Sequence, residues 1–364
     1  MPRRVRLVAV VLPAAMMVTL VDRAALAADS DVPEDMVGMT VNIGKTPFTV
    51  QGFGNVDLVA SAYQGQHSGF SNGAFDLFVT SRLDEHWSAL AELVFEPDGN
   101  AVVPDLERFE VMYEYSDAFR VSAGRLHNPV LQWPITYHHG LFMQVPLERP
   151  ILARWEDEGG LWPLHYVGIL TQGRLLGSAG LTYAVGVGNG RGATLEEVQV
   201  GSDANDNKAI TASIGLSPDI VQGFEIHGST YLDRIPADTT LKETDYALSS
   251  SFVRGPLDVR GEWSQMEHQD ETHSVTYRTT GWFALGAYQL PLQGPQLKLY
   301  ALLEGIDAPG TEPFLMYPSN EQAWSAGLRW DVSRWVALKG AYRSTKIEGL
   351  DHDQEVRAQL AVNF

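Results

Sequence analysis

The chain has 364 residues, a formal net charge of −19 and no cysteine. A chain without cysteine cannot form a disulfide scaffold, a thiolate metal site or a cysteine nucleophile, and its acidic balance argues against nucleic-acid binding because phosphates are repelled. A hydrophobic share of 45% and an aromatic share of 10% argue against intrinsic disorder. The length suits one large or two ordinary soluble domains, or one large β-barrel.

Residues 1–27 have the three parts of a secretory signal peptide. Three arginines among the first six residues precede an apolar stretch over residues 7–20, and Ala25-Leu26-Ala27 is a small-residue cleavage site. The apolar stretch is short for a spanning helix of ~20 residues. Cleavage takes away four Arg and one Asp, so the remaining 22 basic and 44 acidic residues give a net charge of −22. Residues 28–47 are acidic and predict a periplasmic N-terminal tail.

From residue 48 to the last residue, apolar and polar side chains alternate with a period of two, which is the repeat of a β-strand. Each alternating segment is close to the ~9–11 residues that cross a bilayer at a tilt. No later segment has 18 consecutive apolar residues, so any membrane passage would use strands. The sixteen predicted strands are 50–63, 73–82, 87–96, 106–115, 119–125, 164–171, 176–187, 208–216, 224–233, 243–252, 257–266, 276–290, 296–306, 321–331, 335–345 and 355–364.

The predicted connections alternate between short turns and longer loops, which is typical of an outer-membrane barrel. The longer set includes 97–105, 126–163 and 267–275, whereas Gln172-Gly173-Arg174 is expected to be a weak turn. Aromatic residues fall near both ends of the apolar face, as in the two aromatic belts of a membrane protein. The predicted fold class is all-β, a transmembrane antiparallel β-barrel of about 16 strands. A secreted β-sandwich shares the alternation, but it does not explain the alternating lengths or the two belts.

Several segments resemble Gram-negative outer-membrane porins. The ending Val356 to Phe364 is similar to the terminal strand of outer-membrane barrels, which closes with an aromatic residue. The runs 297–304 and 326–330, with Gly124-Arg125 and Asn128-Pro129, loosely resemble the phosphate-selective porin O/P superfamily.

The resemblance implies a homotrimer that passes small hydrophilic solutes, a constriction made by loop 126–163 inside the lumen, and reading of Phe364 as an assembly signal by the barrel-assembly machinery. It does not extend to phosphate specificity, because the basic ladder of that group has no residue-by-residue match in this acidic chain.

The alternation places thirteen acidic and ten basic side chains toward the inside of the barrel. Burying so many charges in a dry core would be prohibitive, whereas sixteen strands leave room for a water-filled pore. Basic residues gather on the last five strands. We therefore expect a basic wall facing an acidic loop, with a preference for cations; alternatively, the loop acids lie at a solvent-facing tip. The predicted pore-wall residues are Arg120, Arg278, Lys298, Arg329, Lys339, Arg343, Arg357, Glu110 and Glu114, and those of the constriction loop are Arg149, Arg154, Glu156, Asp157 and Glu158.

The sequence predicts no catalytic site, metal or cofactor. His67 and Ser71 are faintly similar to the active-site pair of outer-membrane phospholipases, but four residues of strand separate them by ~13 Å. The glycine repeat over residues 186–192 ends a strand and opens no helix, so it lacks a phosphate cradle. His138 and His139 point opposite ways on an extended backbone, which disfavours a shared metal.

The expected function is passive diffusion of small hydrophilic solutes or ions through a channel surrounded by outer-membrane lipid. One alternative is a substrate-specific channel, in which aromatic and histidine side chains of the long loop form a binding track. Another is a non-conducting barrel with a structural or adhesive role, whose lumen is plugged. Saturable flux would separate a specific channel from a general pore.

Overall fold

The computed structural model describes residues 39–364 apart from 44–45, 62–67, 99–100, 138–139, 157–159, 177–178, 195–200, 202, 237–240, 311, 313 and 315–319. The predicted signal peptide and most of the predicted tail lie outside the described residues. So do His67, His138, His139, Asp157 and Glu158.

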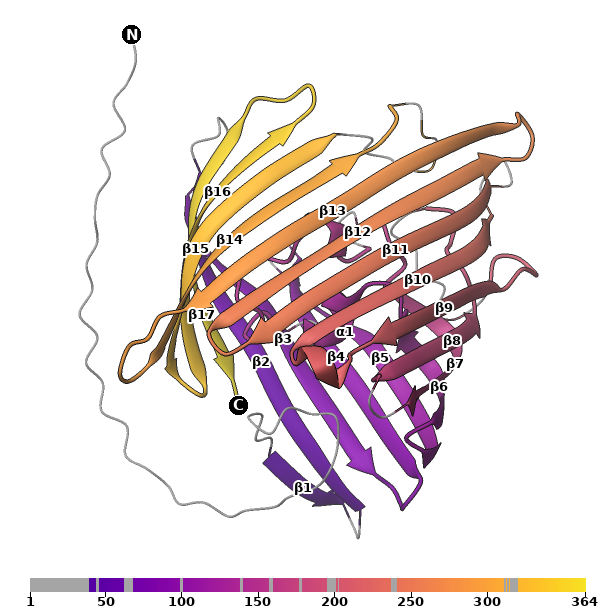
Figure 1. Cartoon of the computed structure of the whole chain (residues 1–364), viewed down its shortest axis with the longest axis horizontal. Helices are drawn as coiled ribbons and strands as arrows, with labels where there is room; N and C mark the ends of the chain where they lie inside the picture. The colour runs from indigo at the N-terminus through magenta and orange to yellow at the C-terminus, as the bar shows by residue number, and fades with distance from the viewer. Residues whose placement is uncertain are drawn as a thin grey trace. The chain divides into compact units, whose positions relative to one another are not determined.

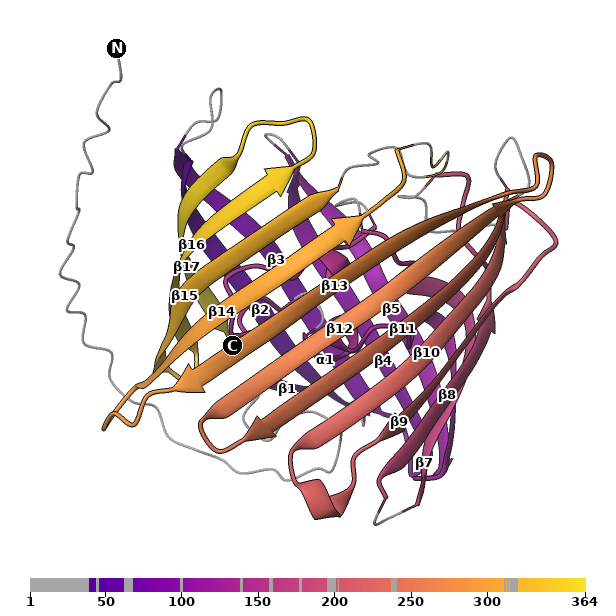
Figure 2. The ribbon, with the colours of Figure 1, turned by 45° about the horizontal axis from the view of Figure 1, so that its top comes forward.

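Sixteen antiparallel strands form a closed barrel, and each pairs with the strands before and after it in the chain (Figures 1 and 2). The ring closes where β17 pairs with β2. This confirms the predicted all-β, sixteen-stranded barrel. The strands are β2 (Thr46–Ser61), β3 (Gly69–Arg82), β4 (Trp87–Asp98), β5 (Ala101–Ser116), β6 (Phe119–His127), β7 (His165–Leu176), β8 (Leu181–Gly188), β9 (Ala209–Leu216), β10 (Phe224–Ile235), β11 (Leu241–Arg254), β12 (Leu257–Asp270), β13 (Val275–Gln289), β14 (Gln296–Asp307), β15 (Glu321–Ser333), β16 (Val336–Ile347) and β17 (Asp353–Asn363).

One further strand lies inside the segment predicted as a tail. β1 (Met39–Ile43) pairs antiparallel with the first residues of β2, from Ile43 opposite Thr46 to Met39 opposite Val50. The described part of the tail is therefore a hairpin strand beside the barrel wall.

Three predicted connections are wrong. Gln172 and Gly173 lie inside β7, where they pair with Arg120 and Tyr183. A Cβ atom on Gly173 would lie 2.2 Å from the carbonyl oxygen of Ala118, so this glycine permits a close approach to the neighbouring turn. The predicted loops 97–105 and 267–275 are largely strand, because β4 with β5 and β12 with β13 continue as hairpins.

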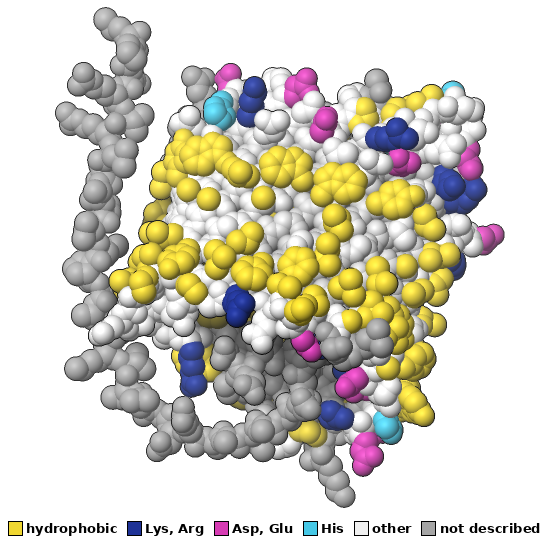
Figure 3. Space-filling model, in the orientation of Figure 1, with side chains coloured by type: hydrophobic (Ala, Val, Ile, Leu, Met, Phe, Trp, Pro, Cys, Tyr) yellow, Lys and Arg dark blue, Asp and Glu magenta, His cyan; other side chains and the backbone are white. Residues whose placement is uncertain are grey.

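The outer face of the barrel is apolar. Trp263, Trp282, Trp324 and Trp330 are each more than two-fifths exposed on strands β12, β13 and β15. On the face shown in Figure 3, hydrophobic side chains gather in two bands across the strands, with charged side chains beyond them. Such an apolar outer face is typical of a transmembrane β-barrel. None of the helices among the described residues is long and apolar enough to cross a membrane.

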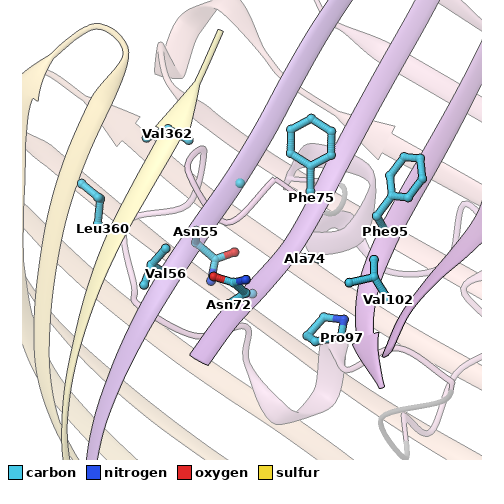
Figure 4. A pocket seen from close by; sticks show the side chains of 12 residues that line it. Asn55, Val56, Asn72, Ala74, Phe75, Phe95, Pro97, Val102, Leu360 and Val362 are labelled. Carbon is cyan, nitrogen blue, oxygen red and sulfur yellow. The ribbon is translucent and has the colours of Figure 1, made fainter. Parts of the chain in front are cut away.

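A shallow groove of about 270 Å³ lies on the outer face, where β17, β2, β3 and β4 meet (Figure 4). Its floor is a bulge, because Gly73 and Ala74 of β3 together oppose the single residue Asn55 of β2. Val56 and Leu360 line it and are exposed on the outer surface. The groove is therefore separate from the lumen.

Candidate functional site

The connection between β6 and β7, residues 128–164, is the inner loop of the barrel. It carries a short helix, α1 (Gln132–Tyr137), and a 3-10 turn, η1 (Ile151–Ala153), and α1 lies within the ring of strands in both views (Figures 1 and 2). Trp133 packs edge-on against Phe283 of β13, with ring centroids 5.4 Å apart. The buried apolar cluster joins inner-loop residues to the inward faces of β13 and β14; its members include Leu152, Trp162, Leu285 and Leu302. Apolar burial therefore fixes one side of the loop to the wall.

Cationic side chains on β15 to β17 hold the opposite side of the inner loop. We call Arg329, Lys339, Arg343 and Arg357 the basic strip. Arg329 donates to the backbone carbonyls of Phe142 and Gln144, the second at 2.7 Å. The Lys339 ammonium donates to the carbonyls of Leu141 and Pro146, the latter at 3.0 Å. These two cations satisfy loop carbonyls that would otherwise be buried without partners.

The remaining two members of the basic strip bind a loop carboxylate. Arg343 lies 3.2 Å from Glu148, and Arg357 pairs with the same side chain. Arg343 also lies 2.5 Å from Glu304 of β14. All four members of the basic strip therefore contact the inner loop.

Carboxylates on β12 and β14, beside the strands of the basic strip, hold backbone N–H groups of the loop. Glu262 of β12 accepts from the backbone of Gln132 at 3.1 Å and of Trp133 at 2.6 Å. Glu304 accepts from the backbone N–H of Ile151 at 2.7 Å. Charge-assisted hydrogen bonds of this kind are about twice as strong as neutral ones. The wall charges thus match the polarity of the loop backbone, with acids on N–H groups and bases on carbonyls.

Glu156 of the inner loop does not face the basic strip. Its carboxylate is buried and accepts from the backbone N–H of His165 at 2.8 Å. Burial alone would raise the pKa of the Glu156 carboxyl, but the neighbouring His165 ring and these hydrogen bonds hold it below its usual value of 4.5. The position facing the basic strip is taken instead by Glu148, which the sequence analysis did not single out.

The two predicted arginines of the loop are also engaged. The Arg149 guanidinium lies 3.8 Å from the centre of the Trp155 ring. Arg154 forms a two-pronged pair with Glu321 of β15 at 2.8 and 2.9 Å. Burial raises the pKa of Tyr137, at the end of α1, to about 12. Arg154 therefore anchors the loop to β15, whereas the Arg149 contact lies within the loop.

The predicted pore-wall residues outside the basic strip form local pairs on the inner face. Arg120 lies 3.5 Å from Glu114, and Lys298 lies 3.8 Å from Asp331. Glu110 also belongs to this inner face, because its neighbour Phe109 is exposed on the outer face.

The assignment of Arg278 to the pore wall is wrong. Its side chain is 66% exposed and bonds to Glu267 at 2.7 Å on the outer face that carries Trp282. The buried residues of this part of β13 are Thr279 and Phe283. β13 is apolar on both faces, so its alternation did not fix its register.

Glu148, Glu262, Glu304 and Glu321 are the anchoring carboxylates that were not predicted as site residues. Glu148 lies between Pro146 and Pro150, and its loop position was the only signal for it. Across the described part of the chain, no group of three His, Asp or Glu residues is arranged to hold a metal ion.

Phe364 lies at the seam of the barrel. Its backbone exchanges two hydrogen bonds with Gly52, at 2.7 and 2.9 Å, and its ring stacks on Phe75 at 5.9 Å. A Cβ atom on Gly52 would lie 2.6 Å from the Phe364 ring. The terminal aromatic therefore closes the ring against the first barrel strand.

Comparison with solved structures identifies the fold. The anion-selective porin from Comamonas acidovorans is 14% identical with a TM-score of 0.63, covering 88% of this chain and all of that one. The outer membrane channel DcaP of Acinetobacter baumannii is 11% identical with a TM-score of 0.63, covering 90% and 100%. The trimer form of OmpT, an outer membrane protein of Vibrio cholerae, is 9% identical with a TM-score of 0.62, covering 87% and 99%.

The chain therefore has the fold of a porin-like outer-membrane barrel, which confirms the porin resemblance. Neither a protein-family model nor a curated protein sequence matches the chain. Identities this low establish the fold alone.

Proposed function

We propose that the chain is an outer-membrane channel through which small hydrophilic solutes or ions diffuse passively. The observation that carries the proposal is the inner loop, which enters the barrel and is anchored by complementary charges to the stretch of wall from β12 to β16. A loop held in this way narrows the lumen, and passage through it requires no catalytic step. The barrel wall also carries partly exposed charge pairs such as Glu114 with Arg120.

We further propose that the channel prefers cations. The cations of the basic strip already bind loop carbonyls and Glu148, so they are poorly placed to bind a passing anion. The chain as a whole carries a net charge of −19. Fixed charge along a narrow pore sets the barrier for ions of each sign.

The remaining proposals concern the setting of the barrel. Residues 1–27 direct export and are removed, residues 28–47 are a periplasmic tail, and Phe364 is read by the barrel-assembly machinery. The apolar outer face contacts outer-membrane lipid. We propose a homotrimer, which is supported by the trimer form named for one similar structure.

A second function is favoured by the apolar cluster between the inner loop and strands β13 and β14. Such packing is unusual for a lumen filled with water and suits a plugged, non-conducting barrel with a structural or adhesive role. A substrate-specific channel is a variant of the first function, with the aromatic residues of the inner loop as a binding track.

The reversal potential of the refolded chain in a planar bilayer under a KCl gradient tests these functions. A channel that conducts, with a reversal potential of the sign expected for cation preference, supports the first proposal. A reversal potential of the sign expected for anion preference would contradict the cation preference but not the channel itself. A folded barrel that carries no current would contradict the open channel and favour the plugged one, and a current that saturates with one solute would indicate the specific channel.

A further inference from the structure

Arg191 follows β8 at the start of the loop 189–208, and it is almost completely buried inside the barrel. Its guanidinium Nε lies 2.9 and 3.0 Å from the two carboxylate oxygens of Glu243 on β11. The same guanidinium donates to the backbone carbonyl of Leu161 in the inner loop. Its backbone N–H donates to Asp233 of β10 at 2.8 Å. One residue thus joins the loop 189–208 and the inner loop to two strands.

A third loop reaches the same place. His268 of β12 lies 3.7 Å from Glu243 and 3.0 Å from Glu312, a residue of the loop 308–320. Glu312 also accepts the backbone N–H of Phe314 at 2.8 Å. The Phe314 ring packs edge-on against His268 at 5.2 Å and lies 5.7 Å from the Arg191 guanidinium.

The glycine repeat of residues 186–192 makes room for this cluster. A Cβ atom on Gly190 would lie 2.1 Å from a carboxylate oxygen of Asp233, the side chain that holds the Arg191 backbone. A Cβ atom on Gly186 or Gly188 would lie 2.4 or 2.5 Å from the Tyr166 side chain. The repeat that suggested a nucleotide site is therefore explained by close packing of β8 and the residues after it.

The charges of the cluster are costly to separate. Arg191, Glu243, His268 and Glu312 are each at least 95% buried, and Asp245 beside Glu243 is fully buried. Removing one member of a buried ion pair leaves its partner desolvated and uncompensated. The three loops can separate only if the ion pairs and hydrogen bonds around Arg191 are broken, so these contacts hold the loops together.

We propose that the Arg191 cluster is a latch that ties residues 189–194, together with Glu312 and Phe314, to the inner loop, with Arg191 as the positioning residue that holds the three together. The latch sets how far the inner loop leaves the lumen open. Its effect on current rests on the proposed channel function, whereas the fastening of the loops does not.

The test combines amide hydrogen exchange and bilayer current on the refolded full-length barrel. The variant Arg191→Met removes the charge and keeps an unbranched side chain as far as the position of Nε. Glu312→Gln weakens only the contact with His268, which in turn lies beside Glu243. The matched control is Arg234→Met, because Arg234 pairs with Glu271 at 2.7 Å but is about half exposed on the outer face. Circular dichroism confirms that each variant retains the barrel.

We expect amide exchange in residues 160–164 and 189–194 to accelerate at least about tenfold in Arg191→Met, the factor that corresponds to about 1.4 kcal/mol. The control leaves it unchanged, and Glu312→Gln gives a smaller acceleration. The channel current rises or becomes noisier in Arg191→Met.

The two proposals fail in different ways. Unchanged exchange and unchanged current in Arg191→Met would overturn the latch, as would an equal effect of Arg234→Met. If no protein conducts but exchange still accelerates, the latch stands and the channel function fails. If only Arg191→Met conducts, the latch holds the native barrel shut.

Discussion

The substitution Glu262→Gln tests the anchoring of the inner loop most directly, because the affected donors are two identified backbone N–H groups. The carboxylate accepts from Gln132 and Trp133 at 3.1 and 2.6 Å and from the Ser249 hydroxyl at 3.0 Å. Glutamine keeps one acceptor oxygen, so one backbone bond is lost and the other loses its charge. Hydrogen bonds to charged groups contribute about 1.5–3 kcal/mol each, so the anchor loses about 2–4 kcal/mol.

Amide exchange of residues 132 and 133 measures this loss. A weakening of about 2–4 kcal/mol accelerates exchange by roughly 30- to 1000-fold where local opening governs it. Glu267→Gln is the matched control, since Glu267 lies on the same strand but pairs with the exposed Arg278 on the outer face. Unchanged exchange at residues 132 and 133 in Glu262→Gln would refute the anchoring role of the wall carboxylates.

Three further outcomes follow from other contacts. Glu148→Gln removes the carboxylate partner of the basic strip, so the reversal potential should move toward anion preference; a shift in the cation direction would contradict the pairing. The lowered pKa of Glu156 contributes stability that is complete above pH 4.5 and is lost as the pH falls through the lowered pKa. Exchange of the His165 amide, corrected for its intrinsic rate, should therefore accelerate in acid, and Glu156→Gln should abolish that dependence. Gly124 has φ +141°, and a Cβ atom there would lie 1.8 Å from the Phe109 carbonyl oxygen. Gly124→Ala should destabilise the barrel by about 1–3 kcal/mol, measured as a lower unfolding temperature, while Gly228→Ala, which meets nothing within 4 Å, should not.

The strand pattern could be predicted because the outer face is apolar along nearly every strand. Period-two alternation is a local property, and it located all sixteen barrel strands. The ends of the strands could be predicted less well. Residues 97–98 and 101–105 include two prolines and two aspartates, which suggest a loop, yet β4 and β5 continue pairing through them. Pairing beyond the membrane depends on the partner strand rather than on side-chain hydropathy.

The site was predicted in part for the same reason. Alternation placed the basic strip on the inner wall correctly. It failed at Arg278, because in β13 Trp282 faces outward while Phe283 faces inward against Trp133. A strand that is apolar on both faces leaves its register undetermined, and a shift of one residue moves every side chain to the opposite face. The path of the inner loop decides which of its carboxylates contacts the basic strip. The alternation of apolar and polar residues along the sequence does not determine that path.

The distribution of the wall charges follows from the needs of a loop that lies inside a barrel. Its backbone brings carbonyls and N–H groups away from water, and each must find a partner. The carbonyls of residues 141, 142, 144 and 146 bind Arg329 and Lys339, and the N–H groups of residues 132, 133 and 151 bind Glu262 and Glu304. Part of the wall charge that a count from sequence assigns to ion selectivity is thus used to hold the loop. Glu148 balances the guanidinium charges of Arg343 and Arg357, whereas Glu262 binds neutral backbone N–H groups and a hydroxyl. Removing Glu148 should therefore alter the ion preference more than removing Glu262.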